Sequence, residues 1–160
     1  MSGTGRAVFD HLTRSSLEET LLMILSRAGE AGWSVMVRGR DRAAMETLDA
    51  RLWVAAGDDG FLPHGLEGGP QDADQPILLG TGALPAAARG LVLIDGAEAS
   101  PQEARPLERV WVLFNGGDEG EVVAARGLWT RLTAGGLAAQ YWTEESGRWA
   151  MKVEKAGSPA

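Results

Sequence analysis

Two histidines and two pairs of acids are the residues of this chain whose types could take part in catalysis. His11 and His64 lie in different segments with no carboxylate motif beside either, and the chain contains no cysteine and no Gly-x-Ser-x-Gly elbow. Two histidines without thiolates leave few ways to build a zinc site, and Asp58-Asp59 and Glu144-Glu145 are more simply solvated turns. The sequence therefore predicts no catalytic residue and no metal site.

A glycine-rich turn is the best candidate for nucleotide binding. Gly80-Thr81-Gly82-Ala83-Leu84-Pro85 follows an apolar strand, as a dinucleotide fingerprint does, but its third position lacks the small residue that close helix packing needs. The acid expected about 20 residues further on could only be Glu98 or a neighbour. No Gly-Lys-Ser or Gly-Lys-Thr occurs, which excludes a P-loop. We expect no cofactor, and a small nucleotide-binding α/β enzyme using Gly80–Pro85 is the alternative.

A second turn, Asn115-Gly116-Gly117, could hold an anion with its backbone amides. An ordinary strand-to-helix turn has the same composition, and the sequence favours that simpler interpretation.

The charge of the chain bears on its partners. The net charge is −7, with thirteen arginines and only two lysines. Direct binding of nucleic acid through the six tryptophans is disfavoured, because an acidic chain has a basic surface only if its arginines cluster. Arginine instead suits bidentate pairing with carboxylates at protein interfaces.

Local patterns predict the elements that must position any site. Ser15-Ser16 and Asp41 are expected to cap two helices, and a third is expected from about residue 118 to 133 after the turn at Asn115-Gly116-Gly117-Asp118. Residues 67–75 are expected to be an exposed loop. The expected strands are 7–12, 33–37, 77–79, 91–94, 110–114, 138–143 and 148–153.

This alternation predicts an α/β fold: a single three-layer domain over 1–155, with a mostly parallel mixed sheet, an antiparallel C-terminal edge and helices on both faces. The sheet is Rossmann-like without a nucleotide site. We expect residues 156–160 to be a disordered tail. No apolar run suits a signal peptide or a membrane span, so a cytoplasmic protein is expected.

Two linked segments resemble a known family. Leu48-Asp49-Ala50-Arg51-Leu52-Trp53 is followed, eight residues after the tryptophan, by Phe61-Leu62-Pro63-His64-Gly65. This pattern resembles the chi subunit family of DNA polymerase III, often called HolC. The resemblance implies a non-catalytic, clamp-loader-associated subunit that binds the acidic C-terminal tail of the single-stranded DNA-binding protein, and also the psi subunit where one is present.

The resemblance places the tail site on the last predicted helix. The tail ends in an aromatic residue with a free carboxylate, so its receptor needs a cation beside an apolar pocket. Arg126 and Trp129 match the family's arginine and aromatic positions and share a helix face, and Leu113 matches the apolar position that lines the pocket. Thr130 stands where a lysine often helps, and Arg131 could compensate. The helical pattern alone equally allows Trp129 in the core and Arg126 as a solvated charge.

The resemblance also implies a second surface, for the psi subunit or another partner. Trp53 and Phe61 match positions that dock psi in the family, and we expect Pro63 and His64 to rigidify the turn between the two segments. A tryptophan at a helix end can form an exposed aromatic ledge or a buried corner, and the sequence does not distinguish the two.

Overall fold

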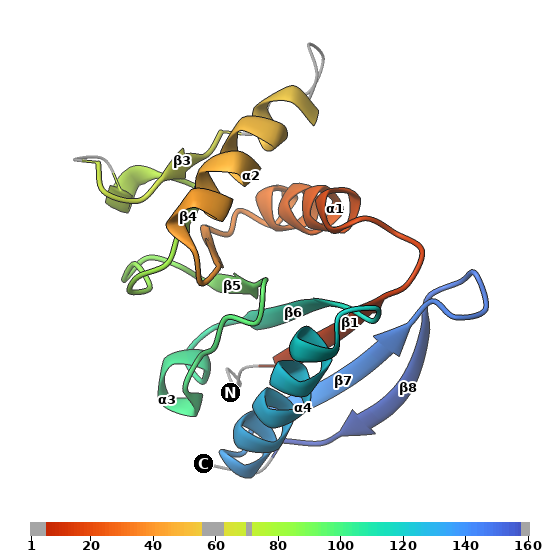
Figure 1. Cartoon of the computed structure of the whole chain (residues 1–160). Coiled ribbons are helices and arrows are strands. Elements are labelled where there is room, and N and C mark those ends of the chain that lie inside the picture. Colours follow the sequence, from red (N-terminus) through yellow and green to blue (C-terminus); the bar gives the residue numbers. More distant parts are fainter. Residues whose placement is uncertain (1–5, 56–62, 70–71, 158–160) are drawn as a thin grey trace.

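A twisted eight-stranded sheet runs through the computed structural model, which describes residues 6–55, 63–69 and 72–157 (Figure 1). The strand order is β3-β4-β2-β5-β6-β1-β7-β8, and only the β7–β8 pair is antiparallel. This confirms the predicted mixed sheet with its antiparallel C-terminal edge. The strands are β1 (Arg6–Leu12), β2 (Val35–Arg38), β3 (Gly65–Leu66), β4 (Ile77–Gly80), β5 (Gly90–Leu93), β6 (Arg109–Asn115), β7 (Ala138–Thr143) and β8 (Ala150–Lys155).

The helices are α1 (Leu17–Glu30), α2 (Arg42–Ala55), α3 (Pro101–Ala104) and α4 (Glu119–Ala134). Helices α1, α2 and α4 begin where the sequence predicts, whereas α3 begins after Ser100, for which no cap was predicted. The side chains of Ser16, Asp41 and Asp118 each accept a hydrogen bond from a backbone N–H in the first turn, at 3.1, 3.2 and 3.1 Å. Each bond satisfies one donor that a helix start leaves without a partner.

The two faces of the sheet are covered by different helices. Figure 1 shows α1 and α2 on one side of the sheet and α3 and α4 on the other. Successive residues of β6 alternate between the two cores: Trp111 and Leu113 pack with α1 and α2, whereas Val112 and Phe114 pack toward α3 and α4. The predicted three-layer α/β architecture is confirmed.

Two expectations about local structure were incomplete. Gly65–Leu66 forms β3, a strand too short to show periodicity, which pairs with β4. The predicted loop that follows contains a 3-10 turn at Asp72–Asp74. Residues 158–160 of the expected tail lie outside the described residues.

No helix in the described part of the chain combines the length and the apolar character that crossing a membrane requires.

Candidate partner-binding site between helix α4 and the sheet

Three aromatic side chains form the floor of a pocket on the α4 face of the sheet. Phe9 of β1 is in register with Tyr141 of β7, and His11 of β1 is in register with Phe114 of β6. Because alternate residues of a strand point to the same face, Phe9, Phe114 and Tyr141 all face α4.

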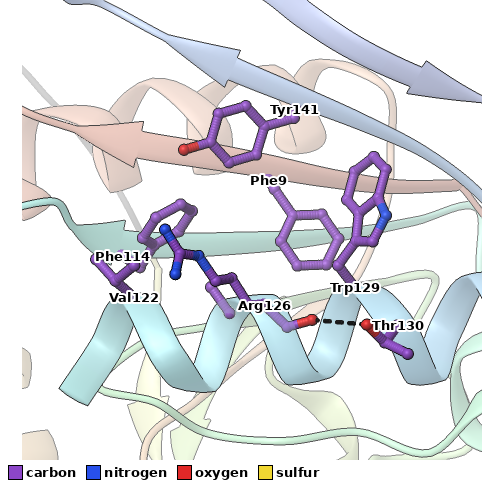
Figure 2. Close-up of a pocket in the computed structure, with 8 residues that line it drawn as sticks. Phe9, Phe114, Val122, Arg126, Trp129, Thr130 and Tyr141 are labelled. Atoms are coloured by element: carbon purple, nitrogen blue, oxygen red, sulfur yellow. Dashed lines mark hydrogen bonds between the residues drawn. The ribbon is translucent and has the colours of Figure 1, made fainter. Parts of the chain in front are cut away.

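Helix α4 supplies the wall of this pocket, which has a volume of about 230 Å³. Val122, Arg126 and Trp129 follow one another at intervals of four and three residues, which places them on one helix face. Figure 2 shows Arg126 and Trp129 projecting from α4 toward the aromatic floor, with Thr130 beside them. Ala125 completes the wall.

The aromatic rings hold one another in place. Phe9 and Trp129 meet edge to face, with ring centroids 5.2 Å apart at 63°, and Phe114 lies 6.0 Å from Tyr141. The Tyr141 hydroxyl is hydrogen-bonded to Nδ1 of His11. His11 in turn leaves room only for glycine at position 116, where a Cβ would lie 2.0 Å from its Nε2. The pocket is therefore a preorganised apolar surface.

Arg126 provides the charge at this pocket. Among the described residues its guanidinium forms no ion pair, while Thr130 Oγ1 donates a 3.2 Å hydrogen bond to the Arg126 carbonyl oxygen. The pKa of Tyr141 is raised by burial and by Glu145, and the nearby Arg126 cation partly offsets this rise. The pocket therefore combines an aromatic floor with a cation whose donors are available to an anion.

The structure brings together only part of the residue set expected for the tail. Arg126, Trp129 and Thr130 line the pocket. Leu113 does not, because it points to the opposite face of the sheet and packs in the α1–α2 core. Arg131 points elsewhere and pairs with Glu98 at 2.7 Å. Trp129 is partly buried and packs against the core, and part of its side chain also lines the pocket.

Sequence reasoning missed the floor residues Phe9, Phe114 and Tyr141. Each of them lies on a strand that the sequence predicts. The order of these strands in the sheet, which the sequence does not show, is what brings the three aromatic side chains together.

A second candidate surface lies at the end of α2. The His64 side chain is buried, and its Nε2 lies 3.2 Å from Oδ1 of Asp49. The Trp53 ring stacks on the His64 ring with centroids 4.1 Å apart. These contacts join the two segments of the motif, because Asp49 and Trp53 of α2 both contact His64. Pro63 is partly buried beside them, and Phe61 lies outside the described residues.

The exposed side chains at the end of α2 favour the interpretation that Trp53 forms an exposed aromatic ledge. Trp53 is 49% exposed and its neighbour Val54 is 81% exposed, although both are large apolar residues. Such side chains beside one another on a surface are typical of a protein contact.

The turns at the carboxyl end of the parallel sheet, where α/β folds bind nucleotides, hold carboxylates of the chain itself. Glu144 Oε2 accepts hydrogen bonds from the backbone N–H groups of Thr13, Arg14 and Ser15, at 2.9, 3.0 and 2.8 Å. This turn follows β1 and precedes α1, where a phosphate would otherwise bind.

The two glycine-rich turns are occupied in the same way. Glu67 Oε1 accepts a 2.7 Å hydrogen bond from the N–H of Thr81, and its carboxylate fills the space beside Gly80 and Gly82. At the other turn, Glu121 Oε1 accepts from the N–H of Asn115 at 3.1 Å. A phosphate would have to displace these carboxylates, so the geometry disfavours the nucleotide-binding alternative.

Residues 6–55, 63–69 and 72–157 contain no candidate metal site. Within them, no group of three or more histidine, cysteine, aspartate or glutamate side chains is placed to hold an ion.

Comparison with known proteins identifies the family. The family model described as DNA polymerase III chi subunit, HolC, matches residues 5–140, a range that includes both candidate surfaces except Tyr141 of the pocket floor. A search of curated proteins finds no match. The matched region extends from before β1 into β7 and covers most of the chain. The chain therefore belongs to the family of the DNA polymerase III chi subunit, HolC, an accessory subunit of that polymerase.

Proposed function

We propose that the pocket between α4 and the sheet binds the acidic C-terminal tail of the single-stranded DNA-binding protein, and that the chain thereby links this protein to the polymerase without catalysing a reaction. The observation that carries the proposal is the guanidinium of Arg126, which lies at the edge of an aromatic pocket and forms no ion pair with any other described residue.

The size of the pocket suits one aromatic side chain. Its volume of about 230 Å³ is below the range of roughly 300–1,000 Å³ found for sites that hold whole drug-sized ligands. A terminal phenylalanine ring can lie against Phe9 and Trp129, while its carboxylate pairs with Arg126 in the bidentate geometry that guanidinium favours. The preceding acidic residues would remain at the surface near the same cation.

Thr130 sets the strength of this binding. Its hydroxyl is hydrogen-bonded back to the helix and adds no charge, where family members often carry a lysine. We therefore expect affinity in the micromolar range that weakens as salt is added, since exposed charge pairs are screened by ions.

A matched pair of peptides tests the proposal. We expect an acidic peptide ending in Pro-Phe to bind with a free C-terminal carboxylate, and its C-terminal amide to bind at least tenfold more weakly, because the amide cannot form the charged pair with Arg126. Isothermal titration calorimetry at low salt measures both. Equal affinity for the two peptides would show that the terminal carboxylate is not recognised.

We further propose that the ledge around Trp53 contacts the psi subunit or another clamp-loader protein. Support comes from the half-exposed ring of Trp53, held in place by the buried His64. Large aromatic anchors of this kind carry much of the binding energy at protein interfaces.

Replacement of Trp53 by alanine tests this second surface. We expect Trp53→Ala to lose at least 2 kcal/mol, roughly thirtyfold, in binding to the clamp-loader protein that the tagged chain captures from lysate. The captured proteins are identified by mass spectrometry and the affinity is then measured with the purified partner. Titration with the tail peptide checks that the variant is folded. Unchanged capture by Trp53→Ala would place the contact elsewhere.

A further inference from the structure

A second cavity, of about 330 Å³, lies on the opposite face of the sheet from the α4 pocket. Its floor is formed by the adjacent strands β6, β1 and β7. Arg109 and Trp111 come from β6, Arg6 of β1 is in register with Arg109, and Trp142 comes from β7. Helix α1 forms one side with Arg27. The core on this face contains no residue of β7 among those described, so Trp142 faces the cavity rather than the core.

Three arginines converge on this cavity, and one carboxyl group, that of Asp10, lines it with them. Within the described ranges, Arg6, Arg27 and Arg109 form no ion pair. Nε of Arg109 is buried and has no hydrogen-bond partner among the described residues. Burial, and secondarily the nearby Arg6, lower the pKa of Arg109. A desolvated cation beside a second cation is stabilised when an anion binds, so the cavity favours a negatively charged ligand.

Tryptophans surround these charges. The Arg109 guanidinium lies 5.8 Å from the ring centroid of Trp111 and 6.0 Å from that of Trp33. Trp142 and Trp149 line the same cavity and are partly exposed. Four of the six tryptophans of the chain thus lie around one group of arginines. Aromatic faces next to cations are the combination that single-stranded nucleic acids use, because bases stack and phosphates pair.

One acid, Asp10, also lines the cavity. Burial, and secondarily Glu144, raise the pKa of Asp10 to about 7. Below this value most Asp10 carboxyls are uncharged, so they do not cancel the charge of the arginines.

We propose that this arginine–tryptophan cavity binds single-stranded DNA, with bases stacked on the partly exposed indoles of Trp142 and Trp149 and phosphates paired with Arg6, Arg27 and Arg109. The net charge of −7 argued against nucleic-acid binding only if the arginines were dispersed, and here they cluster. An acidic peptide would satisfy the arginines but would leave the flat indole faces without stacking partners. This site is separate from the α4 pocket, so the chain can hold the strand and the protein tail at the same time.

Fluorescence anisotropy of a labelled oligo-dT of about 16 nucleotides tests the proposal with the full chain below pH 7. We expect salt-dependent binding with a log–log slope of roughly −2, since three phosphate contacts each contribute about 0.7. Binding should quench the intrinsic tryptophan fluorescence. Arg27→Glu is expected to weaken binding at least tenfold, and Trp142→Leu at least fivefold.

Arg42→Glu is the matched control, because Arg42 is also exposed on a helix and its reversal changes the net charge equally, but it lies away from the cavity. We expect it to bind the oligonucleotide like the unaltered chain. Tail-peptide titration verifies that each variant is folded. The proposal is overturned if the oligonucleotide does not bind, if Arg27→Glu and Arg42→Glu bind it equally well, or if only an acidic peptide binds in an Arg27-dependent manner.

Discussion

Replacement of Arg126 by alanine is expected to weaken binding of the acidic tail peptide by at least tenfold. The guanidinium is the only cation that lines the α4 pocket among the described residues, and its loss leaves the terminal carboxylate of the peptide without a charged partner. Hydrogen bonds to charged groups contribute about 1.5–3 kcal/mol, which corresponds to a loss of roughly ten- to hundredfold. Calorimetric titration with the free-acid peptide measures the effect.

Arg131→Ala is the matched control for this prediction. Arg131 lies on the same helix and carries the same charge, but its guanidinium pairs with Glu98 outside the pocket. We expect Arg131→Ala to retain the affinity within about twofold, apart from a small long-range effect of the lost charge. Arg126→Lys should be intermediate, since an ammonium keeps the charge but cannot form the bidentate pair. Equal losses in Arg126→Ala and Arg131→Ala would mean that general charge, rather than this pocket, attracts the tail.

Replacement of Glu144 by alanine is expected to lower the free energy of unfolding by about 3 kcal/mol or more. Glu144 is 4% exposed, and its carboxylate joins the β7–β8 turn to the start of α1 through the N–H groups of Thr13, Arg14 and Ser15. Its other oxygen accepts from Ser15 Oγ at 2.8 Å. Alanine leaves these donors unsatisfied, and each buried unsatisfied group costs about 1–3 kcal/mol. Urea denaturation followed by tryptophan fluorescence measures the change.

The pH dependence of the free energy of unfolding distinguishes the charged hydrogen bonds of the Glu144 carboxylate from the packing of its side chain. Burial alone would raise the pKa of Glu144, but the hydrogen bonds from Ser15, Arg14 and Thr13 lower it from 4.5 to about 2. A lowered carboxyl pKa contributes stability above the unfolded value near 4.5, and this contribution is lost as the pH falls toward 2. The difference between the unaltered chain and Glu144→Gln should therefore shrink below pH 4.5. A constant difference across this range would contradict the charged interaction.

The local elements could be predicted because their signals are local. Ser16 and Asp118 begin helices through bonds to residues three positions away, and the apolar runs around Phe9 and Val112 mark strands. The antiparallel final pair followed from a polar turn between two short strands. The two segments of the family motif lie together in the structure, but the contact between Trp53 and His64 that joins them was not predicted.

Which side chains of β6 point toward α4 could not be predicted. All five residues from 110 to 114 are apolar and buried, since helices cover both faces, so no alternation shows which of them points toward α4. Leu113 was placed in the pocket, whereas its neighbour Phe114 lies there, because adjacent residues of a strand point to opposite faces.

The role of Glu144 could not be predicted either. Its partners lie 129 to 131 residues earlier in the chain, and they come together only because β1 and β7 are neighbours in the sheet. From the sequence alone, Glu144-Glu145 was interpreted as a solvated turn. The structure shows that this interpretation is wrong for Glu144, which is buried and hydrogen-bonded.

Calorimetric titration of the full chain with the intact single-stranded DNA-binding protein of the same organism, and with that protein lacking its C-terminal tail, tests the central claim most directly. The proposal predicts saturable, salt-sensitive binding to the intact protein, and at least a tenfold loss when the tail is removed. Equal binding to both forms would contradict it, because the pocket between α4 and the sheet would then not be the site that recognises this partner.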